Sequence, residues 1–149
     1  MTLYRRWGDV DRLVRDLMTR EFHAVVASVA EAGRDDAGPG LVPAIVAAVS
    51  GLRREPLFAR VLDVDPDLLL PYVTDRLGST QRAVVELLTA GLRAAQQDGG
   101  VRAGDPVRMA YTVLLIAQSF VLSARTVAEH LDDGALDTEL TRALEAYLR

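Results

Sequence analysis

The chain has 149 residues; half are apolar but only 5% are aromatic, so its core must be built from Leu, Val and Ala. This length favours one domain, and the Ala- and Leu-rich composition favours helix. A net charge of −4 argues against nucleic-acid binding by electrostatics alone. The lack of cysteine excludes disulfides and thiolate metal sites. With no recognisable secretory signal or apolar run of about 18 residues, we expect a cytoplasmic protein that does not enter the membrane.

Helical periodicity recurs along the chain, and Gly, Pro and Asp clusters divide it into segments. Asp9 is placed as a helix N-cap, and the Asp105-Pro106 pair opens a later helix. Pro71 and the Gly78-Ser79 pair predict interruptions within one long helical segment. In chain order, the predicted helices span 9–32, 41–54, 55–62, 66–98, 106–131 and 136–149.

The helix predicted over 106–131 is apolar around most of its circumference. A domain of this length has little room to enclose such a helix, so we expect one of its faces to meet a second chain. The last helix would supply the neighbouring wall of an isologous four-helix bundle. The alternative is a central helix that is fully buried in a monomer. The candidate interface residues are Val113, Ile116, Phe120, Ala124, Val127, Leu136, Leu140 and Leu144.

Three polar residues of the same helix, Tyr111, Gln118 and Arg125, are spaced by seven and lie in or beside its apolar arc. Such groups need partners when buried. They are interpreted as an intersubunit hydrogen bond, an ion pair with an acidic residue of another helix, or rim positions. Alternatively, Tyr111 and Gln118 orient a ligand in an internal pocket. The candidate pocket residues are Phe22, His23, Phe58, Tyr72, Tyr111 and Gln118, a set that predicts a hydrophobic or aromatic small molecule.

The two histidines lie far apart in the sequence, and with no cysteine they give no basis for a metal site. His23 is also interpreted as a satisfied core or surface residue, and His130 as a cation at a helix C-terminus. Phosphate-loop, nucleophile-elbow and metalloprotease motifs are absent from the sequence. We therefore expect a protein that is not an enzyme and that carries no cofactor.

One N-terminal string, Thr2-Leu3-Tyr4-Arg5-Arg6-Trp7-Gly8-Asp9, runs into Val10-Asp11-Arg12-Leu13. It resembles the end of the recognition helix and the start of the linker helix in the TetR family of transcriptional regulators. Looser matches to the effector-binding domain of that family lie at 55–58, 65–72 and 100–106. The resemblance implies an all-α, TetR-type C-terminal domain of about six helices that dimerises through a four-helix bundle.

By the same resemblance, residues 1–8 are a remnant of the recognition helix, and residues 9–149 form the ligand-binding and dimerisation domain with linker helix 9–32. Val10 departs from the family, which commonly has a lysine at this position. A helix-turn-helix needs roughly two further helices before its recognition helix. We therefore expect binding of operator DNA only where that N-terminal domain is present. The DNA-contact remnant would be Thr2, Tyr4, Arg5 and Arg6.

The function implied is that of a one-component transcriptional repressor that forms a homodimer and responds to a small hydrophobic effector. Two alternatives stay open. One is a stand-alone helical dimerisation module that sequesters a partner regulator. The other is a small all-α carrier of an apolar ligand.

Overall fold

The computed structural model describes residues 40–64, 66–69 and 77–149, together with six helical positions nearer the N-terminus: Asp16, Thr19, Arg20, His23, Ala24 and Ala27. Every regular element in this part of the chain is helical, which confirms the predicted all-α class. The α-helices are α2 (Leu41–Arg54), α3 (Pro56–Val64), α5 (Ser79–Gln97), α6 (Pro106–Leu122) and α7 (Asp133–Leu148). Two short 3-10 helices are η1 (Pro66–Leu68) and η2 (Ala124–Val127).

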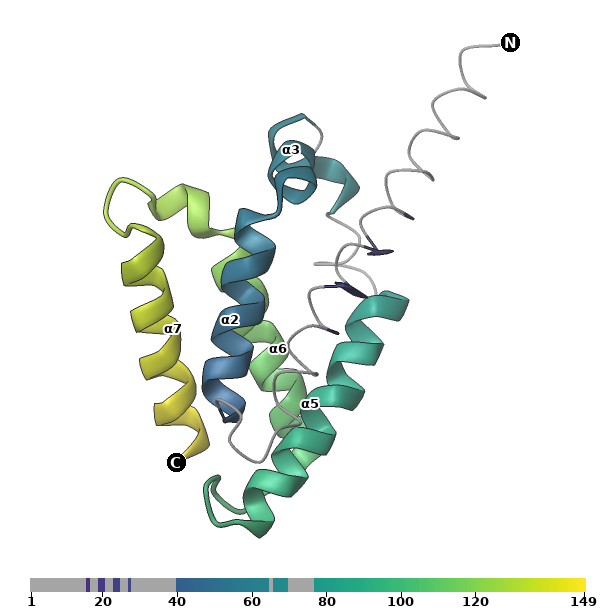
Figure 1. Cartoon of the computed structure of the whole chain (residues 1–149), viewed down its shortest axis with the longest axis vertical. Coiled ribbons are helices and arrows are strands. Elements are labelled where there is room, and N and C mark those ends of the chain that lie inside the picture. The colour runs from purple at the N-terminus through teal and green to yellow at the C-terminus, as the bar shows by residue number, and fades with distance from the viewer. Residues whose placement is uncertain are drawn as a thin grey trace.

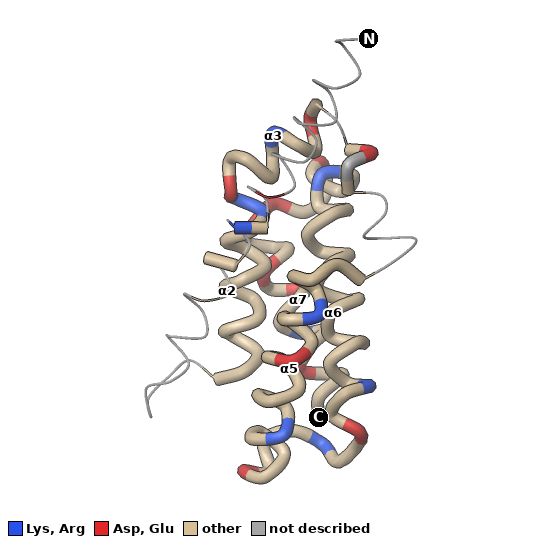
Figure 2. The backbone as a smooth tube through the Cα atoms, turned by 90° about the vertical axis from the view of Figure 1, so that its right-hand side faces the viewer, with Lys and Arg blue, Asp and Glu red and all other residues tan. Residues whose placement is uncertain are grey.

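The four longer helices α2, α5, α6 and α7 lie side by side as a bundle (Figure 1). Helices α2 and α6 run in one direction, and α5 and α7 run back in the other (Figure 1). The α5–α6 loop and the C-terminus lie at one end of the bundle, and α3 and η2 lie at the other (Figure 1). The end that holds α3 carries charges of both signs (Figure 2).

Local signals in the sequence set most of the helix boundaries. The side chain of Asp105 accepts a hydrogen bond from the N–H of Val107 at 2.9 Å, and Pro106 follows at the first helical position, as predicted. Gly99 has a φ of 72°, the left-handed conformation that commonly closes a helix, and it follows the last turn of α5. The interruption predicted at Gly78-Ser79 is confirmed, because residues 77 and 78 are not helical and α5 begins at Ser79.

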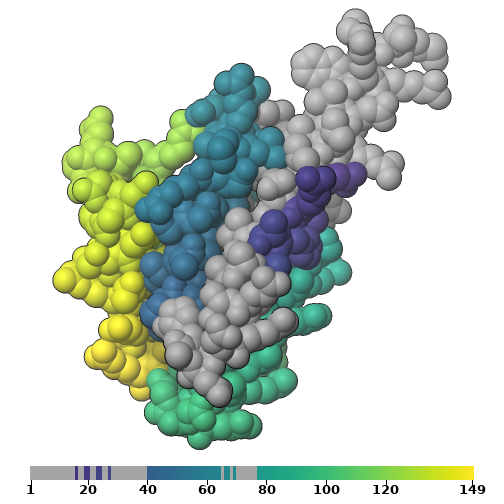
Figure 3. Space-filling view, viewed as in Figure 1, coloured from purple at the N-terminus to yellow at the C-terminus, as the bar shows by residue number. Residues whose placement is uncertain are grey.

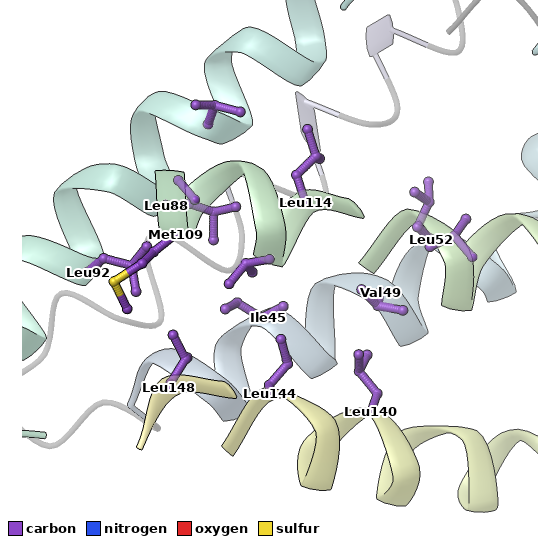
Figure 4. Packing of buried hydrophobic residues seen from close by; sticks show 14 of the residues in the cluster. Ile45, Val49, Leu52, Leu88, Leu92, Met109, Leu114, Leu140, Leu144 and Leu148 are labelled. Atoms are coloured by element: carbon purple, nitrogen blue, oxygen red, sulfur yellow. The ribbon is translucent and has the colours of Figure 1, made fainter. Parts of the chain in front are cut away.

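Leucine side chains of α7 form one wall of the core. Leu140, Leu144 and Leu148 point towards α2, where Ile45 and Val49 face them (Figure 4). These α7 positions recur every four residues, which places them on one stripe of the helix. The core therefore depends on α7 as much as on the central helices.

The helix predicted over 106–131 ends nine residues earlier, at Leu122. The chain continues through Ser123 into η2, and the hydroxyl of Thr126 donates to the carbonyl of Ser123 at 2.7 Å. This bond to the carbonyl three residues earlier accompanies the change from α-helical to 3-10 geometry. Consequently His130 lies in a turn and not at the C-terminus of an α-helix.

The acidic pair that follows, Asp132-Asp133, begins a helix. The side chain of Asp132 accepts a hydrogen bond from the N–H of Ala135 at 2.8 Å and so caps α7. The last predicted helix is confirmed and starts three residues before Leu136.

Candidate functional site

Four of the six predicted pocket residues lie in the part of the chain that the structure describes. Phe58 is buried in the main core, Gln118 is half-buried and His23 is exposed. Phe22 and Tyr72 lie outside the described residues, as do the DNA-contact candidates Thr2, Tyr4, Arg5 and Arg6.

Tyr111, another of the pocket candidates, lies at the surface of the protomer. It is one of three large apolar residues that α6 leaves in contact with solvent. Val107 is 39% exposed, Tyr111 is 42% exposed and Leu115 is 66% exposed. Their spacing of four residues places them along one side of the helix. We call Val107, Tyr111 and Leu115 the α6 stripe.

The α6 stripe changes the assignment of the dimer interface. Val113, Leu136, Leu140 and Leu144 are buried against the protomer's own helices, so they are core residues and are not available to a second chain. The partly buried Ile116 and Phe120 also pack against that core, and Ala124 and Val127 lie half-buried in η2. Helix α6 leaves an apolar face outside the protomer core, and this face consists of residues other than the predicted interface candidates. The reason is rotational: the residues at 109, 110, 113 and 114 turn inward, and 107, 111 and 115 then point outward.

Arg125, the third polar residue of the predicted series, forms an ion pair with Asp63. The pair joins η2 to α3, so of the readings left open for Arg125 the ion pair with another helix is confirmed. Both side chains are about half exposed, so the contact is solvent-screened.

A polar cluster between α2 and α7 was not found by sequence reasoning. The side chain of Arg53 is only 4% exposed, and its Nη2 lies 2.6 Å from Oδ1 of Asp137. The Nε of Arg53 lies 3.4 Å from Oδ1 of Asp133, and the hydroxyl of Ser50 donates to Oδ2 of Asp137 at 3.0 Å. A signal was present: Arg53 follows Val49 by four residues and so continues the buried side of α2.

This cluster lies beside an open groove of about 440 Å³ between α2 and α7. The surfaces of these two helices meet on the face shown in Figure 3. Small residues form most of the walls of this groove, and one basic and one acidic residue, Arg54 and Asp137, also line it. It is lined by Pro43, Val46, Ala47, Ser50, Gly51, Arg54, Asp137 and Thr141.

Other kinds of site find no support among the residues described. Within them, no three His, Cys, Asp or Glu side chains come together as a metal site would require. Among the helices searched in that same part of the chain, none has the length and apolar character needed to span a bilayer.

Comparison with known proteins gives relatives by sequence. No protein-family model and no solved structure matches the chain. An HTH-type (helix-turn-helix) transcriptional regulator of Mycobacterium bovis is 43% identical over 147 residues, which cover 99% of this chain and 76% of the relative. HTH-type transcriptional regulators from two Mycobacterium tuberculosis strains, CDC 1551 and H37Rv, are 42% identical over the same length and coverage. The extent of this similarity shows that the chain belongs to the HTH-type transcriptional regulators.

Proposed function

We propose that the chain is the effector-binding and dimerisation part of a TetR-type transcriptional repressor, with residues 9–149 as that domain and residues 1–8 as the end of the recognition helix. Three observations support this. The relatives are named as HTH-type regulators over nearly the whole chain. The described residues form a helical bundle. The N-terminal string from Thr2 to Leu13 resembles that family at the junction of its two domains.

The observation that carries the dimer is the α6 stripe. Full burial of one large apolar side chain contributes roughly 1.5–3 kcal/mol, yet Leu115 remains 66% exposed in the protomer. Arg108 is the single charged residue of α6, so little on this helix opposes contact with another apolar surface. An isologous contact brings the same surface of both protomers together, so the α6 stripe of one protomer lies against the α6 stripe of its partner. In this proposal the homodimer covers Val107, Tyr111 and Leu115.

Sedimentation equilibrium of the wild-type chain and of Leu115→Glu tests the dimer. We expect a wild-type dimer at micromolar concentration and a monomeric variant, because a carboxylate buried at an apolar contact is costly. Ala90→Glu is the matched control, since Ala90 is exposed on α5, and it is expected to stay dimeric. A wild-type monomer at tens of micromolar, or a Leu115→Glu variant that associates as tightly as wild type, contradicts the proposal.

For the effector, we propose a hydrophobic small molecule bound on the inner side of the bundle, near Phe58 and Gln118, with Phe22 and Tyr72 as further contacts. The exposed His23 is not included. An apolar lining with a few polar groups is the usual character of such sites. Displacement of the dye 1-anilinonaphthalene-8-sulfonate by apolar compounds measures binding. Gln118→Leu is expected to change the ranking of these compounds without changing sedimentation, and an unchanged ranking removes Gln118 from the site.

For DNA, we propose that operator binding requires a complete helix-turn-helix and that the effector acts by shifting a population of dimer geometries. Couplings of this kind are typically about 1–3 kcal/mol. A salt-titrated binding assay compares this chain with a chain in which a TetR-type helix-turn-helix precedes it. Tight, sequence-specific binding by residues 1–149 alone contradicts the requirement for those additional helices.

A further inference from the structure

Helix α7 is held at its two ends by two arginines that come from different parts of the fold. Arg53, in the last turn of α2, binds Asp133 and Asp137 in the first two turns of α7. Arg102, in the α5–α6 loop, binds its last turn. Between these ends α7 contacts the bundle through its stripe of buried leucines (Figure 4).

The C-terminal attachment is complete and contains no carboxylate. Arg102 donates its backbone N–H to the carbonyl of Leu148 and its Nε–H to the carbonyl of Tyr147, both at 2.8 Å. Its guanidinium carbon lies 4.8 Å from the centre of the Tyr147 ring. Two of the carbonyls that a helix leaves unpaired at its C-terminus are thus satisfied, and a cation lies at the negative end of the helix dipole.

The loop that carries Arg102 is itself fixed to both neighbouring helices. The side-chain amide of Gln96 donates to the carbonyls of Arg102 and Gly104, each at 3.0 Å. Gly104 has a φ of 159°, and a Cβ added there would lie 3.2 Å from both Nη1 of Arg102 and Sδ of Met109. The C-terminal end of α7 is therefore joined to α5 and α6 through a tightly packed loop.

The N-terminal attachment is incomplete. Arg53 reaches Asp137 at 2.6 Å, but its contacts to the side chain and the carbonyl of Asp133 are long, at 3.4 and 3.3 Å. Its Nη1 is buried and has no hydrogen-bond partner among the described residues. A buried N–H without an acceptor destabilises the closed arrangement, since opening would let water satisfy it. The end of α7 at Arg53 is thus the more easily released of the two.

We infer that α7 is a pivoting helix: its C-terminal turn stays fixed by Arg102, and its N-terminal turns separate from α2 when Arg53 releases Asp133 and Asp137. The moving end lies at the same end of the bundle as α3 and η2 (Figure 1). Such a motion changes the angle between α7 and α6 while leaving the α5–α6 pair in place. The pivot is a property of the single protomer and does not depend on the proposed effector or dimer.

Hydrogen exchange read by mass spectrometry tests the pivot on the whole chain. Arg53→Met is expected to speed exchange at residues 135–141 by about tenfold, the effect of losing one buried charged hydrogen bond. Exchange at residues 145–149 should stay at the wild-type rate. Arg102→Met is the matched variant. It should speed exchange at residues 145–149 and leave exchange at residues 135–141 at the wild-type rate. Equal acceleration along the whole of α7 in either variant, or no change at 135–141 in Arg53→Met, overturns the inference.

A second measurement serves if Arg53→Met does not fold. Asp133→Asn removes one partner of Arg53 at an exposed position and should speed exchange at 135–141 alone, by a smaller factor. The chain has no cysteine, so single substitutions Leu140→Cys and Leu148→Cys report opening of each half through their rate of thiol labelling. Asp133→Asn should accelerate labelling at 140 and leave labelling at 148 unchanged. Equal labelling of both positions, whatever the variant, shows a helix that opens as one unit.

Discussion

The Nη2 of Arg53 and the Oδ1 of Asp137 lie 2.6 Å apart and join two helices whose contacting residues are 84 positions apart in the sequence. Removal of the carboxylate in Asp137→Ala leaves the guanidinium buried with its remaining, weaker partner. We expect a loss of about 2–4 kcal/mol in the free energy of unfolding, because breaking a buried ion pair strands the other charge. Urea denaturation measures it.

A double substitution distinguishes the loss of the Arg53–Asp137 ion pair from the effect of packing around it. In Arg53→Met with Asp137→Leu both charges are gone, and the free energy of unfolding should return to within about 1 kcal/mol of wild type. A double variant as unstable as Asp137→Ala would show that packing around the cluster, and not the unpaired charge, causes the loss.

Truncation to alanine should lower the free energy of unfolding much more at Leu144 than at Leu115. Leu144 is fully buried and Leu115 is 66% exposed in the protomer. Leu144→Ala is expected to lower the free energy of unfolding by about 2–5 kcal/mol through lost burial and a cavity. Leu115→Ala should change it by less than about 0.5 kcal/mol under conditions where the protein is monomeric. Thermal unfolding of both variants at low protein concentration makes the comparison.

Adding a side chain at Gly99 should destabilise the fold, although there is space for a Cβ. Its φ is 72°, and nothing lies within 4 Å of an added Cβ. Gly99→Ala is expected to cost about 1 kcal/mol through backbone strain alone. The neighbouring Gly100, whose φ is not in this region, is the control, and Gly100→Ala should be close to neutral. Equal losses in the two variants would assign the effect to something other than the left-handed conformation.

The ion pair between Arg125 and Asp63 should contribute little to stability. The side chains are 56% and 49% exposed, and pairs of this kind are worth about 0–1 kcal/mol. Asp63→Asn should therefore lower stability by less than about 1 kcal/mol, and the difference from wild type should shrink as salt rises. A larger loss that persists in 1 M salt would show that the pair holds η2 against α3 more firmly than its exposure indicates.

Local chemistry in the sequence was enough to predict the all-helical class and several helix ends. Asp105-Pro106 and Gly78 act within a turn or two of themselves, through a capping carboxylate and a break in periodicity. The four-residue spacing of Leu136, Leu140 and Leu144 likewise marked a helix with one buried side. Such signals depend on neighbours in the chain and do not require knowledge of the fold.

The rotation of α6, and the partner of Arg53, were decided only by tertiary structure. The sequence showed α6 to be apolar on several sides but could not say which side meets α2, α5 and α7, because each face satisfies the same periodicity. Packing turned Val113 inward and left Leu115 outside. Similarly, Asp137 could be identified as the partner of Arg53 only once α2 and α7 were adjacent. Periodicity records how much apolar surface a helix carries, whereas the choice among faces depends on which other helices reach it.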